Sequence, residues 1–147
     1  MSPEVEISQS IIRPYGLEKD PNWDRIDTLI DLLPQRSGEL RLSHIVDERT
    51  TDRKLRPYDE RYDEHYVHVS ADSGRYLITY FSSDRDEEDV KVFSYDNTSV
   101  KPGEEMVEII GDYWDASMVC TDLEIVRRAF KEFYETGDFW MENFFLT

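Results

Sequence analysis

The sequence predicts an α+β fold, an antiparallel β-meander packed against an N-terminal and a C-terminal amphipathic helix, in a single globular domain of residues 1–147. Two segments with a helical apolar period enclose a series of short alternating segments separated by turn residues. Short turns join antiparallel strands, and each amphipathic helix must bury its apolar stripe against another layer. A two-layer sandwich satisfies both requirements, and 147 residues with 13% aromatic side chains can fill one core.

The N-terminal part predicts a short strand and then a helix. Val5 and Ile7 alternate with polar residues, which is typical of a strand with one buried face. Asp20 is expected to cap a helix that begins at Pro21, because proline is favoured at the first helical position. Pro34 is expected to end this helix. Its expected buried face consists of Trp23, Ile26, Leu29, Ile30 and Leu33.

The middle of the chain predicts a strand meander. Alternating apolar residues predict strands at residues 39–46, 66–69, 75–81, 90–95 and 105–110. Gly74 ends a four-residue hairpin turn between the second and third of these strands. Residues 47–64 are densely charged without a period and predict a long loop. Residues 111–118 predict a second loop, which carries Tyr113 and Trp114.

The sequence predicts where the C-terminal helix begins and where it ends. Thr121 and Glu124 have the spacing of a capping box, in which each side chain caps the backbone N–H of the other residue. Gly137 supplies the left-handed residue that ends a helix. The apolar stripe between them consists of Val126, Ala129, Phe130, Phe133 and Tyr134. The aromatic tail that follows, residues 139–145, either packs back as a last strand or forms an anchor surface for a partner.

The charge predicts the kind of partner. Seventeen basic residues against 33 acidic ones give a net charge of −16, which repels nucleic acid and anionic lipid and attracts basic proteins. General solubility is the competing explanation of this charge. The N-terminus lacks a signal-peptide pattern, and no apolar stretch reaches the roughly 20 residues of a membrane helix. We therefore expect a cytoplasmic protein that contacts neither nucleic acid nor membrane.

The residue types that carry chemistry do not form a recognisable site in the sequence. His65 and His68 are three apart, so a strand would point them to opposite faces, and surface histidines are a better interpretation than a metal site. Cys120 is the single cysteine, and a packed, inert thiol is favoured over a nucleophile. The sequence has neither a phosphate-binding glycine loop nor a hydrolase elbow. We therefore expect no catalytic residue, no metal and no cofactor.

The last third of the chain, from about Gly111 to Phe144, resembles the immunity proteins of bacterial polymorphic toxin systems, of the type that neutralises deaminase toxins. Both the capped helix with a Thr-Gly stop and the order of a short helix followed by a meander are similar to that family. The resembling string is Met118-Val119-Cys120-Thr121-Asp122-Leu123-Glu124, followed by Ala129-Phe130-x-x-Phe133-x-x-Thr136-Gly137.

The resemblance implies a non-enzymatic antidote that binds a cognate secreted toxin and covers its active site or substrate path. Toxins that act on nucleic acid need basic clefts, which an acidic inhibitor would match. The partner-binding residues are expected in an acidic turn and in two aromatic-containing segments: Asp84, Asp86, Glu87, Glu88, Asp89, Tyr95, Asp96, Tyr113 and Trp114. A monomer or weak homodimer is expected. An acidic adaptor for a basic cellular protein and a small enzyme that uses surface carboxylates are the alternatives.

Overall fold

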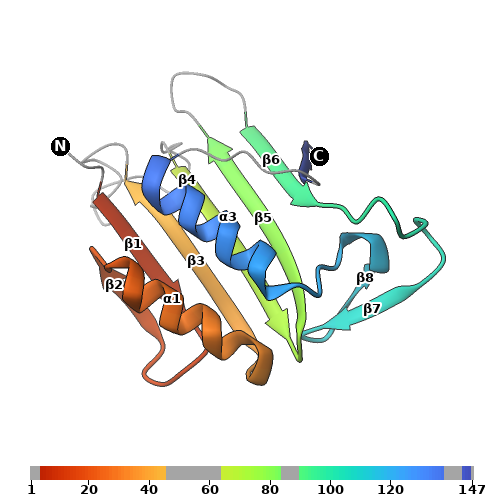
Figure 1. The fold of residues 1–147 in the computed structure, drawn as a ribbon, viewed down its shortest axis with the longest axis horizontal. Helices are drawn as coiled ribbons and strands as arrows, with labels where there is room; N and C mark the ends of the chain where they lie inside the picture. Colours follow the sequence, from red (N-terminus) through yellow and green to blue (C-terminus); the bar gives the residue numbers. More distant parts are fainter. Residues whose placement is uncertain (1–3, 46–63, 84–89, 138–143, 147) are drawn as a thin grey trace, which may run out of the picture.

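The computed structural model describes residues 4–45, 64–83, 90–137 and 144–146 and has a mixed α+β fold (Figure 1). The strands are β1 Glu4–Gln9, β2 Gly16–Lys19, β3 Gly38–Ile45, β4 Glu64–Asp72, β5 Arg75–Ser83, β6 Val90–Tyr95, β7 Met106–Ile109, β8 Asp112–Asp115 and β9 Phe144–Leu146. The helices are α1 Trp23–Leu32 and α3 Leu123–Thr136, with 3-10 helices η1 Leu33–Gln35 and η3 Ala116–Met118. The α+β class and the antiparallel sheet are confirmed.

The main sheet has seven strands in the order β2-β1-β3-β4-β5-β6-β9, and every neighbouring pair is antiparallel. Only β3 to β6 form the expected meander. β1 lies between β2 and β3, and β2 is a strand that the sequence pattern did not predict. The expected strand at residues 105–110 is present as β7, but its place at the end of the meander is wrong, because β7 pairs with β8 in a separate two-stranded sheet. Part of the expected loop at 111–118 is therefore β8 and η3.

One face of the main sheet carries the core, and Figure 1 shows both helices lying over the same face. Alternate residues of the strands point to this face and are buried, which is why their apolar side chains recur with a period of two. The buried sheet residues include Val5, Ile7, Leu40, Leu42, Val67, Val69, Tyr76, Ile78 and Tyr80. The buried helix residues are Ile26, Leu29 and Ile30 of α1 and Val126, Ala129, Phe130 and Phe133 of α3.

The helix ends differ from the expected caps at both N-termini. Asn22 caps α1 by accepting the Arg25 N–H, whereas Asp20 lies before the helix with a φ of 49°. Asp122 caps α3 by accepting the Glu124 N–H at 3.0 Å, so the capping box based on Thr121 is wrong by one residue. Asn and Asp are among the residues that cap helices best, so Asn22 can take the place of Asp20, and Asp122 that of Thr121.

The C-terminal end of α3 is as predicted. Gly137 adopts a φ of 71° and donates its N–H to the Phe133 carbonyl at 2.8 Å. A left-handed residue at this position carries little steric cost only when it is glycine. The predicted hairpin turn is also confirmed, because Ser73 and Gly74 have positive φ angles of 52° and 81° between β4 and β5.

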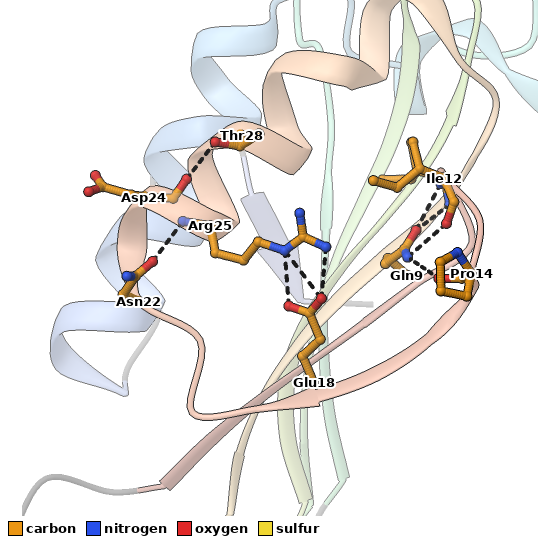
Figure 2. Close-up of polar contacts among 9 residues, drawn as sticks. Gln9, Ile12, Pro14, Glu18, Asn22, Asp24, Arg25 and Thr28 are labelled. Carbon is orange, nitrogen blue, oxygen red and sulfur yellow. Dashed lines mark hydrogen bonds and ion pairs between the residues drawn. The ribbon is translucent and has the colours of Figure 1, made fainter.

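Polar contacts shape the connection between β1 and β2 and join β2 to α1 (Figure 2). The Gln9 amide accepts the N–H groups of Ile11 and Ile12 and donates to the carbonyls of Ile12 and Pro14, which shapes the connection from β1 to β2. Glu18 of β2 accepts hydrogen bonds from the Arg25 guanidinium of α1, the shortest at 2.7 Å. These contacts hold the edge strand β2 beneath the helix.

The aromatic tail is described only at its end. Phe144 is buried and pairs with Tyr95 of β6, whereas Phe145 is 48% exposed on the opposite face. Residues 139–143 and the charged segment 46–63 lie outside the described residues. Within the described part of the chain, neither helix has the length and apolar character that crossing a membrane would require.

Candidate functional site

Exposed apolar side chains gather on the β7–β8 hairpin. Seven large hydrophobic residues are exposed in the described part of the chain, and four of them belong to residues 106–114. These four are Met106, Ile110, Tyr113 and Trp114. Tyr113 is 67% exposed, the highest fraction of the seven. Aromatic side chains that water surrounds in the free protein are the residue types that anchor protein interfaces.

The two faces of the hairpin differ. The register pairs Val107 with Trp114 and Glu108 with Tyr113, so these pairs lie on opposite faces. Ile109, on the Trp114 face, is 2% exposed, which shows that this face is the one turned toward the rest of the protein. Tyr113 therefore points outward, while Trp114 belongs to the inner face.

The tip of the hairpin is fastened to the β4–β5 turn through Asp72. Asp72 Oδ2 accepts the Ile110 N–H at 2.9 Å, and Oδ1 accepts the Ser37 hydroxyl at 3.0 Å. These hydrogen bonds, the Ile110 N–H first, hold the pKa of Asp72 below its usual value. The hydrogen bonds favour the charged carboxylate, so protonation of Asp72 weakens the attachment.

The base of the hairpin is fastened as well. Asp115 accepts the N–H groups of Gly103 and Ser117, at 2.7 and 3.0 Å, and both contacts lower its pKa. Farther along, Cys120 and Tyr76 exchange two backbone hydrogen bonds of 2.8 Å, which join this segment to β5. A hairpin held at both ends loses little conformational entropy when it binds a partner.

Ile110 at the hairpin tip has strained backbone geometry. Its φ is 47°, in the left-handed region that β-branched residues rarely adopt, and its side chain is 46% exposed. Glycine or asparagine would fit this turn with less strain. An exposed isoleucine in an unfavourable conformation is consistent with a role in contact rather than in stability.

A groove of about 350 Å³ lies between the hairpin segment and the sheet face that the helices leave uncovered. Apart from the core residue Ile78, its sheet residues occupy the alternate positions opposite to the core residues. Trp114 of β8 and Met118 of η3 line the other side. The groove residues from the sheet are His68, Ser70, Leu77, Thr79, Val92 and Ser94, together with Ile78.

His68 of the groove has a lowered pKa. Burial lowers the pKa of its imidazole, while Glu39, whose carboxylate lies 3.6 Å away, raises it by a smaller amount. On the same face, the Arg41 guanidinium lies over the Tyr66 ring at 4.2 Å, and Tyr66 stacks on Phe81 at 5.0 Å. The uncovered face therefore combines aromatic, hydroxyl and imidazole groups.

The structure places the predicted contact residues in different environments. Tyr113 and Trp114 are exposed on the hairpin, as the interface hypothesis requires. Tyr95 is 7% exposed and packs edge-on against Phe144 at 5.6 Å in the core, so its assignment to a contact surface is wrong. Asp96 follows β6 and is half-buried. Asp84, Asp86, Glu87, Glu88 and Asp89 lie outside the described residues.

The sequence analysis did not identify the sheet residues of the groove as candidate site residues. His68, Thr79 and Ser94 lie on three different strands and become neighbours only through the pairing of His68 with Thr79 and of Thr79 with Ser94. Their alternation with apolar core residues was a usable signal, because it places all three on the face away from the core. No comparable sequence pattern places Trp114 and Met118, which complete the groove, beside these residues.

The environments of the histidines and the cysteine agree only in part with the expectations from the sequence. His65 and His68 do lie on opposite faces, but His44 is 5% exposed and is not a surface histidine. His44 donates its Nε2–H to the Phe133 carbonyl at 2.8 Å, and burial lowers its pKa. Cys120 is buried, which raises the pKa of its thiol. Within the described residues, no three metal-binding side chains gather together.

Asp72→Ala is expected to loosen the hairpin tip and to destabilise the protein by about 1 kcal/mol, because the Ile110 N–H loses its acceptor. The lowered pKa of Asp72 means that this stabilisation is complete above the pKa of an unfolded aspartate and disappears as the pH falls through the folded value. Amide hydrogen exchange at Ile110 measures both effects. Asp112→Ala, which removes an exposed carboxylate from the same hairpin, is the control. Equal exchange rates in the two variants would contradict the attachment.

Comparison with known proteins identifies a fold and a family. No curated protein matches the chain. The crystal structure of a hypothetical protein from Neisseria gonorrhoeae has a similar fold, with a TM-score of 0.62 and 15% sequence identity over 94% of this chain and 91% of that one. This likeness concerns the fold alone. A model of DUF6911, a family of unknown function, matches residues 5–142, and the chain therefore belongs to the DUF6911 family.

Proposed function

We propose that this protein is a non-enzymatic immunity protein of the bacterial cytoplasm, which neutralises a cognate secreted toxin by binding its toxin domain. The toxin acts on nucleic acid in this proposal, and the antidote occludes its active site. The observation that carries the proposal is the β7–β8 hairpin, which presents exposed apolar side chains on an anchored support. The net charge of −16 and the resemblance of the C-terminal third to immunity proteins support it.

The hairpin combines the two properties that a fast and tight inhibitor needs. Its carboxylates are Glu108, Asp112 and Asp115, and Glu104 and Glu105 directly precede it. A surface of one charge sign steers an oppositely charged partner and raises the association rate, especially at low salt. Exposed anchors such as Tyr113 slow dissociation once they are desolvated in the complex. A nucleic-acid-processing toxin has a basic cleft of the matching sign.

An acidic adaptor that binds a basic cellular protein is the second candidate. The same charge and the same exposed hairpin support it. The two functions differ in their genetic setting, because an immunity gene lies beside the gene of a secreted protein with a toxic C-terminal domain. Loss of toxicity upon co-expression with that domain separates the immunity protein from the adaptor.

Tyr113→Ala is expected to weaken binding to the neighbouring toxin domain about 30-fold, or about 2 kcal/mol, through faster dissociation. The melting temperature should hardly change, because Tyr113 is mostly exposed. Surface plasmon resonance at two salt concentrations measures the rates. Tyr15→Ala is the matched control, since Tyr15 is also exposed, at 56%, and precedes the edge strand β2.

Two results would contradict the proposal at different levels. If wild-type protein leaves cells unprotected from the toxin domain and does not bind it, the immunity function is wrong. If wild-type protein binds but Tyr113→Ala and Tyr15→Ala dissociate alike, the function stands and the hairpin is not the contact surface.

A further inference from the structure

The groove beneath the hairpin has an uncharged floor. His68, Thr79 and Ser94 form a row across β4, β5 and β6, since the register pairs each with the next. Burial lowers the pKa of His68 and so favours its neutral imidazole, and the other two side chains carry only hydroxyl groups. A charged group placed on this floor would lose much of its hydration, and the three floor side chains would offer it hydrogen bonds in return. The floor therefore selects an uncharged occupant with some capacity to hydrogen-bond.

The walls of the groove favour an aromatic ring. Trp114 stands on one side with Met118 beside it, and Leu77 and Val92 contribute apolar surface from the sheet. Aromatic rings pair favourably with an indole in stacked or edge-on geometry, and the thioether of methionine adapts to a ring edge. The hydroxyls of Thr79 and Ser94 can pair with a phenol group. A tyrosine side chain meets all three conditions.

The surroundings of the groove are acidic on two sides. Glu39 is 59% exposed and reaches the groove residues Ser70, at 3.3 Å, and His68, at 3.6 Å. On the hairpin side, Asp112 is exposed and shares the inner face of the hairpin with Trp114. Arg41 also borders His68 and keeps its charge over the Tyr66 ring, so this side of the groove carries one cation beside the Glu39 carboxylate. Cationic residues on either side of the inserted ring would therefore meet carboxylates.

We propose that this groove receives a single tyrosine-like side chain from a basic segment of the protein partner, with a lysine or arginine on each side of the ring. The inference rests on the proposed function for the identity of that partner. Within the interface, the groove is the part that selects a particular side chain of the partner. Because the hairpin is fastened through Asp72 and Asp115, the groove exists before the partner arrives. The outward residue Tyr113 then covers the neighbouring surface of the partner.

The test uses short peptides, so it does not depend on any toxin. Acetyl-Arg-Tyr-Arg-amide is titrated into the labelled protein while the Trp114 indole signal is followed by NMR. We expect saturable binding that is about tenfold tighter than for acetyl-Arg-Ala-Arg-amide, the difference that burying an aromatic ring supplies. Acetyl-Glu-Tyr-Glu-amide should not bind, because its charges oppose those of Glu39 and Asp112. Nuclear Overhauser contacts should join the tyrosine ring to the Met118 methyl group.

Two matched variants locate the site. Ser94→Leu fills the floor and should abolish the tenfold preference for tyrosine, whereas Ser43→Leu adds the same side chain to the same sheet face on β3 and should not. Glu39→Gln should weaken the arginine-flanked peptide several-fold. If Ser94→Leu does not fold, the contacts between the peptide ring and Met118 in the wild-type protein still decide the matter.

Four outcomes would overturn the inference. They are equal affinity for the tyrosine and alanine peptides, an unchanged preference in Ser94→Leu, no contact between the ring and Met118, and binding of acetyl-tyrosine-amide as tight as that of the arginine-flanked peptide. The last would make the groove a small-molecule site. If the peptide binds but the protein does not neutralise the toxin, the groove assignment stands and the immunity function is wrong. If the protein neutralises the toxin but does not bind the peptide, the immunity function stands and the groove assignment is wrong.

Discussion

Replacing Phe133 with alanine is expected to lower the free energy of unfolding by about 3–5 kcal/mol, the largest stability effect that we predict for one side chain. Phe133 is fully buried between α3 and the sheet. Its ring packs edge-on against His44 at 4.6 Å and against Tyr80 at 5.8 Å. A cavity there removes contacts to two strands at once. Because small domains have about 5–15 kcal/mol of stability in total, the variant would be close to unfolding.

Urea denaturation followed by circular dichroism measures this change. Phe145→Ala is the matched control, because Phe145 is 48% exposed in β9 and should cost less than about 1 kcal/mol. The substitution removes the ring contact with His44 but should leave the hydrogen bond of His44 in place, since that bond uses the backbone carbonyl of Phe133. Similar midpoints for the two variants would contradict the packing of α3 on the sheet.

Gly38→Ala is expected to destabilise the protein by about 1–3 kcal/mol through a steric clash. A Cβ atom at Gly38 would lie 2.6 Å from the Ser10 carbonyl oxygen and 3.2 Å from the Ile11 Cα atom. Both are backbone atoms, so no side chain can rotate away. The approach is held by two hydrogen bonds of 2.9 Å, from the Ser10 N–H to the Glu39 carbonyl and from the Glu39 N–H to the Ser10 hydroxyl.

Gly16→Ala separates the clash from the backbone conformation. Gly16 and Gly38 have similar φ angles of 154° and 158°, but a Cβ atom at Gly16 would meet nothing described within 4 Å. Any cost common to the two variants therefore belongs to the conformation, and the difference belongs to the contact with Ser10. Thermal unfolding of both variants measures that difference. Equal melting temperatures would show that β1 and β3 can move apart at this point without cost.

The residues that we expect to control stability and those that we propose for recognition lie in different parts of this molecule. The core depends on Phe133 and its neighbours beneath the helices, whereas Tyr113 is exposed on the separate hairpin. We therefore expect Tyr113→Ala to alter binding without altering folding, and Phe133→Ala to do the opposite at temperatures where it remains folded. This separation lets loss of function be assigned to contact rather than to unfolding.

The sequence alone determined the properties that depend on local chemistry. Gly137 ends α3 because a left-handed residue is needed there, and Ser73-Gly74 turns β4 into β5. Alternating residues indicated which side chains of β4, β5 and β6 share a face. Each of these inferences needs only a few neighbouring residues. Tyr113 and Trp114 were predicted in a loop and lie instead in β8, although both are exposed.

The tertiary structure alone decided what depends on distant pairing. Alternation gives a strand two faces but does not name its neighbour, so the insertion of β1 between β2 and β3 could not be read from the pattern. For the same reason, β7 could not be assigned to its own hairpin, nor Tyr95 to the core beside Phe144. The groove arises only when that hairpin is fastened by Asp72 over the uncovered face, through a contact between residues 38 positions apart.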